Sequence, residues 1–313
     1  MKKLVAMLVI LFMFITTFTF SQTIKTEVYT NAIYGVDTLW NAGTNGKGES
    51  TFNLKDVFLG VDYGFTENFS ANVTLRYNND KVDIYTASIK YQTTISKDLD
   101  LNLSLGRTES FWYGYTNALW GNYSVDNVLS HKFGFVDRTK TGVTAVLVNK
   151  NVLGALEISN DKVNNKNKAL GFSIVLLPVD NLKIGGFFNT YKELNIVNNS
   201  YGGSIFYKLN TKNIGSINLY GEVDFKKSVE DFPVKAEAFS LWGEYFFKES
   251  PFSVLVKFDN YLAYGITQEQ SLLGGINYSP TKSYKFGLNW HNYNNLKMSK
   301  SHNELGFTAS FIL

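Results

Sequence analysis

Three histidines, His131, His291 and His302, are the side chains of this sequence best suited to take a proton from a serine nucleophile. None of them belongs to a recognisable serine motif, and each is more simply a polar residue of a wall or a loop. The sequence has no cysteine, which excludes disulfides and thiolate metal sites, and three histidines leave little for zinc. We therefore expect no enzyme activity, no cofactor and no metal site.

Two pairs of carboxylates, Asp98/Asp100 and Glu222/Asp224, have the i, i+2 spacing that places both groups on one face of a strand. Such a pair could divide general acid and base roles, but a strand with one wet face produces the same pattern by default.

The lysines are dispersed, the net charge is +3 and the pI is near 8.7. This small basic excess predicts no nucleic-acid partner.

Apolar and polar residues alternate with period 2 through most of the chain, as they do in strands that bury one face. In the segment 68–78, Phe69, Val73 and Tyr77 share a face with two further apolar residues, while Ser, Asn, Thr and Arg occupy the other. The last residues, 305–313, alternate in the same way. A soluble β-sandwich would also show this pattern, so the number and length of the strands must separate the two fold classes.

The alternation predicts sixteen strands, many of them about ten residues long, which suits a tilted crossing of a bilayer. An even number agrees with outer-membrane barrels, whose two chain ends lie on the periplasmic side. The connections are short on one side and longer on the other, and we expect all four prolines in connections. The fold class predicted is therefore all-β, a transmembrane antiparallel up-and-down β-barrel with a long third outer loop. The expected strands are 24–36, 52–65, 68–78, 82–94, 98–107, 139–149, 151–159, 168–177, 182–192, 201–209, 216–227, 235–247, 252–261, 270–279, 284–293 and 303–313.

The first residues have the pattern of a secretory signal peptide. Lys2 and Lys3 precede an apolar run over 4–15, and small or hydroxylated residues follow up to Ser21. We expect cleavage after Ser21, which makes 1–21 the signal peptide and 22–313 the barrel. A membrane anchor is the alternative, although the apolar run is shorter than a span of about 20 residues.

Two features carry a resemblance to a known family. The terminal segment 304–313 is similar to the alternating signal that outer-membrane barrels present to the barrel-assembly machinery, with Phe307, Phe311 and Leu313 on its apolar face. The longest connection, 107–138, follows the fifth strand. In both respects the chain resembles the sixteen-stranded, general-diffusion type of bacterial outer-membrane porin.

This resemblance implies a fold, a location and a set of partners. It implies a water-filled channel in the outer membrane for ions and small hydrophilic solutes, contact with outer-membrane lipid, and a homotrimer. It also implies that the third outer loop folds into the lumen and narrows it. Many family members end in Phe, whereas this chain ends in Leu313, with Phe311 two positions earlier.

A weaker likeness is to phosphate-selective porins, through the aromatic run 109–115 followed by Trp120, Asp137 and 142–143. The chain has only Arg76, Arg107 and Arg138, so a ladder of arginines that could hold oxyanions bidentately is missing. Phosphate transport is therefore not inferred.

The expected functional site is the narrowest part of the lumen, where wall and loop charges bias which solutes enter. The predicted register turns equal numbers of acidic and basic residues inward, so the sequence does not set a selectivity. The inward set is Lys25, Arg76, Lys90, Lys183, Lys208, Lys226, Lys257 and Lys285, against Glu27, Asp62, Asp100, Glu222, Asp224, Glu244, Asp259 and Glu304. For the constriction we expect acidic loop residues to face Arg76, Lys90 and other basic wall residues. The candidate set is Arg76, Lys90, Arg107, Glu109, Asp126, Asp137 and Arg138.

Two alternatives stay open. The segment 107–138 could be an ordinary exposed loop whose aromatic residues pack against the wall. The whole chain could also be a plugged structural or adhesive surface barrel, with the Asn-rich loops 160–167, 193–200 and 294–303 binding a partner.

Overall fold

The structure is a computed structural model, and it describes residues 22–38, 49–78, 81–122, 126–160, 168–193, 196–211, 213–228, 235–281, 283–296 and 300–312. The predicted signal peptide, residues 1–21, lies outside the described residues, as does Leu313. The side chains of the first two strands up to Asp56, and of Phe311, are also outside the description.

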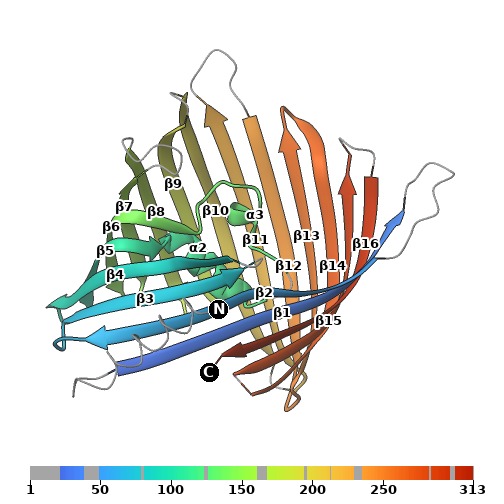
Figure 1. The fold of residues 1–313 in the computed structure, drawn as a ribbon, viewed down its shortest axis with the longest axis horizontal. Coiled ribbons are helices and arrows are strands. Elements are labelled where there is room, and N and C mark those ends of the chain that lie inside the picture. Colours follow the sequence, from blue (N-terminus) through green and yellow to red (C-terminus); the bar gives the residue numbers. More distant parts are fainter. Residues whose placement is uncertain are drawn as a thin grey trace.

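Sixteen strands make up nearly all of the described chain, at the positions that the alternation predicts (Figure 1). Each strand pairs antiparallel with its neighbours in sequence, and β1 pairs with β16, which closes the sheet into a barrel. Closure removes the unpaired edges of the sheet, so no backbone hydrogen-bonding row faces the surroundings. The strands are β1 Gln22–Thr38, β2 Glu49–Gly64, β3 Phe69–Asn78, β4 Lys81–Ser96, β5 Leu99–Glu109, β6 Thr139–Asn149, β7 Val152–Asn160, β8 Lys168–Val179, β9 Leu182–Glu193, β10 Ile196–Thr211, β11 Gly215–Ser228, β12 Lys235–Phe247, β13 Phe252–Ala263, β14 Ile266–Thr281, β15 Tyr284–Asn295 and β16 Lys300–Ile312.

Several strands are longer than the alternation indicates. β10 begins at Ile196, so the Asn-rich stretch 196–200 is paired with β9 and β11 and is not part of a loop. The alternation fades there because ladder pairing continues beyond the part of the strand that needs an apolar outer face. β5 likewise continues to Glu109, two residues into the connection expected from the sequence.

The expectation that all four prolines lie in connections is wrong for Pro178 and Pro280. Both lie within the last residues of a strand, in β8 and β14. In each case the pairing register with the next strand shifts at that point, between Leu176 and Val179 and between Tyr278 and Thr281. The irregularity allows a residue without a backbone donor to stay at the strand end. Pro251 does lie in a turn, and Pro233 lies outside the described residues.

The two faces of the barrel wall differ in chemistry, as β13 illustrates. Val254 and Val256 point outward and are exposed, whereas Ser253, Leu255 and Lys257 point inward and are buried. The same alternation places leucine, isoleucine, valine and aromatic side chains on the outside of most other strands. An apolar exterior around a polar interior is the arrangement of a transmembrane barrel, and it explains a mean hydropathy of only −0.11. Among the described residues, no helix has the length and apolar character for a membrane crossing.

The apolar exterior gives a first prediction. Val256 is 52% exposed in the middle of the outer face, and Val256→Arg should reduce the free energy of folding into lipid vesicles by about 2–4 kcal/mol, because the arginine must leave water for hydrocarbon. Urea titration of the vesicle-folded protein measures this cost. The matched variant Ser104→Arg, which faces the polar interior, should cost less than about 1 kcal/mol. Equal costs for both variants would contradict the assignment of the lipid face.

Candidate functional site

The connection between β5 and β6 contains the two helices of the described chain, α2 Phe111–Trp120 and α3 Leu129–Lys132 (Figure 1). We call residues 110–138 the inner loop. Its neck is closed by the Ser110 backbone N–H, which donates to the Arg138 carbonyl over 2.9 Å. α2 ends at Gly121, whose φ of 61° is left-handed and whose N–H donates to the Asn117 carbonyl, a common helix C-terminus. The loop therefore leaves and re-enters the wall at one place.

Aromatic contacts pack the inner loop against the inner face of β8–β14. Trp112 meets Phe187 with ring centroids 5.0 Å apart, and Trp120 meets Trp242 at 5.3 Å. A Cβ on Gly185 would lie only 3.0 Å from the Trp112 ring, so this glycine leaves the space that the tryptophan occupies. Loop and wall residues form one buried apolar cluster, and Figure 1 shows both helices inside the barrel.

Buried charges hold the second half of the inner loop to the same wall. The Lys257 ammonium of β13 lies 2.6 Å from Asp126 and 3.0 Å from Asp259, and Lys132 of α3 lies 3.0 Å from Asp259. Lys132 also lies 3.5 Å from Asp126 and 4.0 Å from Glu269. We call Asp126, Lys132, Lys257 and Asp259 the ion cluster. Its formal charges cancel, which lets four charged groups remain buried together.

The inner loop contributes two members of the ion cluster, and their pKa values move in opposite directions. Burial alone would raise the pKa of Asp126, but the charges of Lys132 and Lys257 lower it well below its usual range. Burial alone would lower the pKa of Lys132, but Asp126 and Asp259 raise it above its usual range. Both groups are therefore held in their charged forms.

A pH prediction follows from these two shifts. The depressed pKa of Asp126 gives a stabilisation that is complete above about pH 4 and is lost as pH falls through the depressed value. The raised pKa of Lys132 gives a stabilisation that is complete below about pH 10 and is lost as pH rises through the raised value. We expect the loop to stay docked, and single-channel conductance to stay constant, from about pH 5 to pH 9. A conductance step inside that window, recorded at fixed KCl, would contradict the assignment.

Amide and hydroxyl groups fix the loop just after α2. Asn122 donates to the Glu244 carboxylate over 3.1 Å and accepts from Asn277 over 3.1 Å. Ser253 donates to Glu244 over 2.6 Å, and Lys285 lies 3.6 Å from the same carboxylate. The Trp112 indole N–H donates to Glu222 over 3.3 Å. The loop thus covers Glu222 of β11 and Glu244 of β12.

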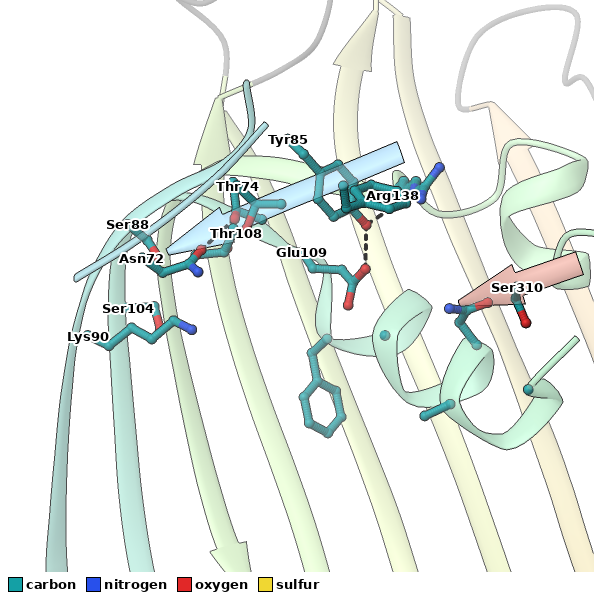
Figure 2. Close-up of a pocket in the computed structure, with 18 of the residues that line it drawn as sticks. Asn72, Thr74, Tyr85, Ser88, Lys90, Ser104, Thr108, Glu109, Arg138 and Ser310 are labelled. Atoms are coloured by element: carbon teal, nitrogen blue, oxygen red, sulfur yellow. Dashed lines mark hydrogen bonds between the residues drawn. The ribbon is translucent and has the colours of Figure 1, made fainter. Parts of the chain in front are cut away.

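A cavity of about 910 Å³ lies on the other side of the inner loop, between α2 and the inner faces of β2–β6 and β14–β16. Figure 2 shows its wall. Most of the side chains that line it are small and polar, and a few are charged. The small polar ones include Asn72, Thr74, Ser88, Ser104, Thr144 and Ser310, and the charged ones are Lys90, Glu109, Arg138 and Lys285. This cavity lies beside the half of the lumen that the loop fills.

The Tyr85 hydroxyl links the two charges at the neck of the loop. It donates to the Glu109 carboxylate and accepts from Arg138 Nε at 3.0 Å, as the dashed lines in Figure 2 show. The Arg138 guanidinium also lies over three aromatic rings, with its carbon 5.1 Å from the Phe58 centroid, 4.7 Å from Tyr85 and 5.6 Å from Tyr113. Cation–π contacts on several sides hold the guanidinium in place.

The structure brings three of the seven expected constriction residues to this cavity, namely Lys90, Glu109 and Arg138. Arg76 instead pairs with Asp83 at 3.3 Å, and Arg107 donates to Thr139 over 3.3 Å. The cavity lining includes neither of these two arginines, nor the half-buried Asp137, so the prediction is wrong for all three.

The expectation that acidic loop residues face Arg76 and Lys90 is wrong for Asp126. It is buried on the far side of the loop, in the ion cluster.

Of the residues expected to form the C-terminal assembly signal, Phe307 points outward with 52% exposure. The Phe311 side chain and Leu313 lie outside the described residues.

Sequence reasoning missed several residues of the loop–wall contact. Glu157 is 2% exposed and pairs with Lys140 at 3.3 Å. The alternation in 151–159 places Glu157 on the inward face and could have identified it. Lys132 gave no such signal because its partner Asp259 lies 127 residues away in the sequence. Tyr85 gave none because it lies at a register shift between β3 and β4, where the alternation is interrupted.

No protein-family model matches the chain, and a comparison with curated proteins finds no matching sequence. Solved structures do match it along nearly its whole length. An anion-selective porin from Comamonas acidovorans is similar with a TM-score of 0.70 and 10% identity, covering 94% of this chain and 99% of that one. The fold is that of the bacterial outer-membrane porins.

Other porin-fold structures agree. The outer-membrane expressed OmpT of Vibrio cholerae gives a TM-score of 0.67 and 12% identity, covering 95% of this chain and 99% of that one. Salmonella typhi OmpF, in complex with daunomycin, gives a TM-score of 0.63 and 10% identity, covering 93% of this chain and 98% of that one. The porin fold is thus retained while few residues are shared, so the function must be argued from the site.

Proposed function

We propose that this chain is a porin of the bacterial outer membrane, forming a water-filled channel for passive diffusion of ions and small hydrophilic solutes. The observation that carries the proposal is the polar cavity of about 910 Å³ between α2 and β2–β6. It lies inside a closed barrel whose exterior is apolar. A hydrophilic passage through an apolar cylinder is what a solute needs to cross a membrane.

Lys90, Tyr85, Glu109 and Arg138 form the narrow part of the channel in this proposal. Opposite charges linked through the Tyr85 hydroxyl create a local field that orders water and sorts polar solutes. No chemistry on the solute is proposed. His131 packs edge-on against Tyr113 with centroids 5.1 Å apart, and His291 lies 3.7 Å from Tyr293, which suits structural roles for both histidines.

The remaining parts of the proposal concern targeting and assembly. Residues 1–21 direct export and are removed, and Phe307, Phe311 and Leu313 are read by the barrel-assembly machinery. The working form is a homotrimer surrounded by outer-membrane lipid. One similar structure, the in-vitro folded OmpT of Vibrio cholerae, is described as a trimer form.

Reconstitution tests the channel directly. Residues 22–313, folded in detergent and added to a planar bilayer, should produce discrete and long-lived current steps in KCl. Liposome swelling should show small sugars entering faster than large ones. Heat-denatured protein at the same concentration is the control.

The second candidate is a plugged surface barrel, which the loop filling the β8–β14 side of the lumen favours. A protein that inserts with full β-structure and yet passes no current would support this candidate and overturn the porin proposal. Conductance in the reconstituted bilayer therefore separates the two.

A further inference from the structure

The charged side chains on the two sides of the inner loop differ in kind. On the docked side, the loop and ion pairs cover the acidic wall residues. Glu157 pairs with Lys140, Asp259 with Lys132 and Lys257, and Glu244 accepts from Asn122, Asn277 and Ser253. Three of the inward carboxylates expected from the sequence, Glu222, Glu244 and Asp259, are therefore buried under the loop and removed from the open cavity.

On the open side, the described charged residues that line the larger cavity are three cations and one anion, namely Lys90, Arg138, Lys285 and Glu109. The charges of Glu109 and Arg138 are linked through the Tyr85 hydroxyl. The Lys285 ammonium lies 3.6 Å from the Glu244 carboxylate, which compensates its charge. Lys90 remains as the uncompensated charge of this passage.

Lys90 lies where it can act on a passing solute. Its side chain is exposed on the inner face of β4, opposite Ser104 of β5, and Figure 2 shows both on the cavity wall. It lines the larger cavity and also a second one of about 370 Å³, whose rim carries Glu67 in the β2–β3 turn. Among the side chains that the structure describes, Lys90 makes no ion pair.

We propose that the channel prefers small hydrophilic anions to cations, and that Lys90 is the main residue that sets this preference. The inference rests on the proposed porin function and adds the class of solute. An unpaired ammonium group on a narrow, low-dielectric wall raises the local concentration of anions and lowers that of cations. Arg138, held over its three aromatic rings, keeps a second positive charge at the neck of the loop.

The test is the reversal potential across a planar bilayer with a KCl gradient centred near 0.1 M. We expect the parent protein to be permeable to chloride about threefold more than to potassium. Lys90→Gln should lower this ratio about twofold or more, Lys90→Glu should bring it below one, and Lys90→Arg should keep it near the parent value. In 1 M salt the Debye length falls to about 3 Å, so the parent ratio should approach one.

Lys150→Gln is the matched control, because it removes one positive charge from the exposed β6–β7 turn and none from the cavity wall. It should leave the ratio unchanged. A parent ratio of one or below, or equal ratios for Lys90→Gln and Lys150→Gln, would overturn the anion preference while leaving the porin function intact. A folded protein without conductance would overturn both.

Discussion

Replacement of residues 111–136 by a four-residue Gly-Ser turn is expected to increase single-channel conductance about twofold or more, because the current through a wet pore follows its open cross-section. The cut is compatible with the wall, since Glu109 and Thr139 are already a paired position of β5 and β6. The hydrogen bond between Ser110 and Arg138 shows that the chain ends at the neck are close. The deletion removes the aromatic and charged contacts that fill the β8–β14 side.

Planar-bilayer recording measures this effect, and heat-modified migration on a gel shows whether the barrel still forms. The charged wall residues that the loop covers, such as Lys257 and Asp259, gain water in the deletion variant and need no new partner. Unchanged conductance in a folded loop-deletion barrel would contradict the assignment of the inner loop as the narrowing element.

Lys257→Met is expected to release the inner loop without unfolding the barrel. Lys257 is 2% exposed and lies within 3.0 Å of both Asp126 and Asp259, and its removal leaves Lys132 alone to neutralise two buried carboxylates. Loss of one partner from a buried ion pair costs about 3 kcal/mol or more. Because this cost falls on the loop–wall contact, the loop should open while the ladder of the strands stays intact.

The absence of cysteine from the chain makes this opening measurable. Ser130 of α3 is completely buried, so Ser130→Cys should react with a water-soluble maleimide only when the loop leaves the wall. Labelling should be at least about tenfold faster in the Lys257→Met background than in the parent, the factor expected for a loss of about 1.4 kcal/mol or more. Lys248→Met, in the exposed β12–β13 turn, is the matched control. Equal labelling rates in both backgrounds would show that the ion cluster does not hold the loop.

The barrel could be predicted from the sequence because its pattern is local. Whether Val256 or Lys257 faces lipid depends only on period 2, and the structure confirms the predicted strands and their antiparallel order. The errors lie at the strand ends, as at Ile196 and Pro280, where the apolar outer face is no longer needed and the pattern fades.

The site was less predictable because its contacts are not local. Asp126 and Lys257 are 131 residues apart in the chain, and no spacing rule connects them. The sequence could show that the segment 107–138 is long and aromatic, but the side of the lumen that it covers depends on Trp112, Trp120 and Phe133 meeting rings on β9, β12 and β13. Selectivity depends on that choice, since it decides which wall charges remain in contact with water.

The anchoring of the inner loop also has a consequence for the order of assembly. Asn122 binds Asn277, which is 155 residues further along the chain, and Trp112 binds Glu222 across 110 residues. Contacts between residues so far apart in sequence form late, because the cost of closing long loops must be met first. The loop can find these partners only after β11–β14 have joined the wall. We therefore expect the width of the lumen to be set late in assembly, after the strands that hold the loop have joined the wall.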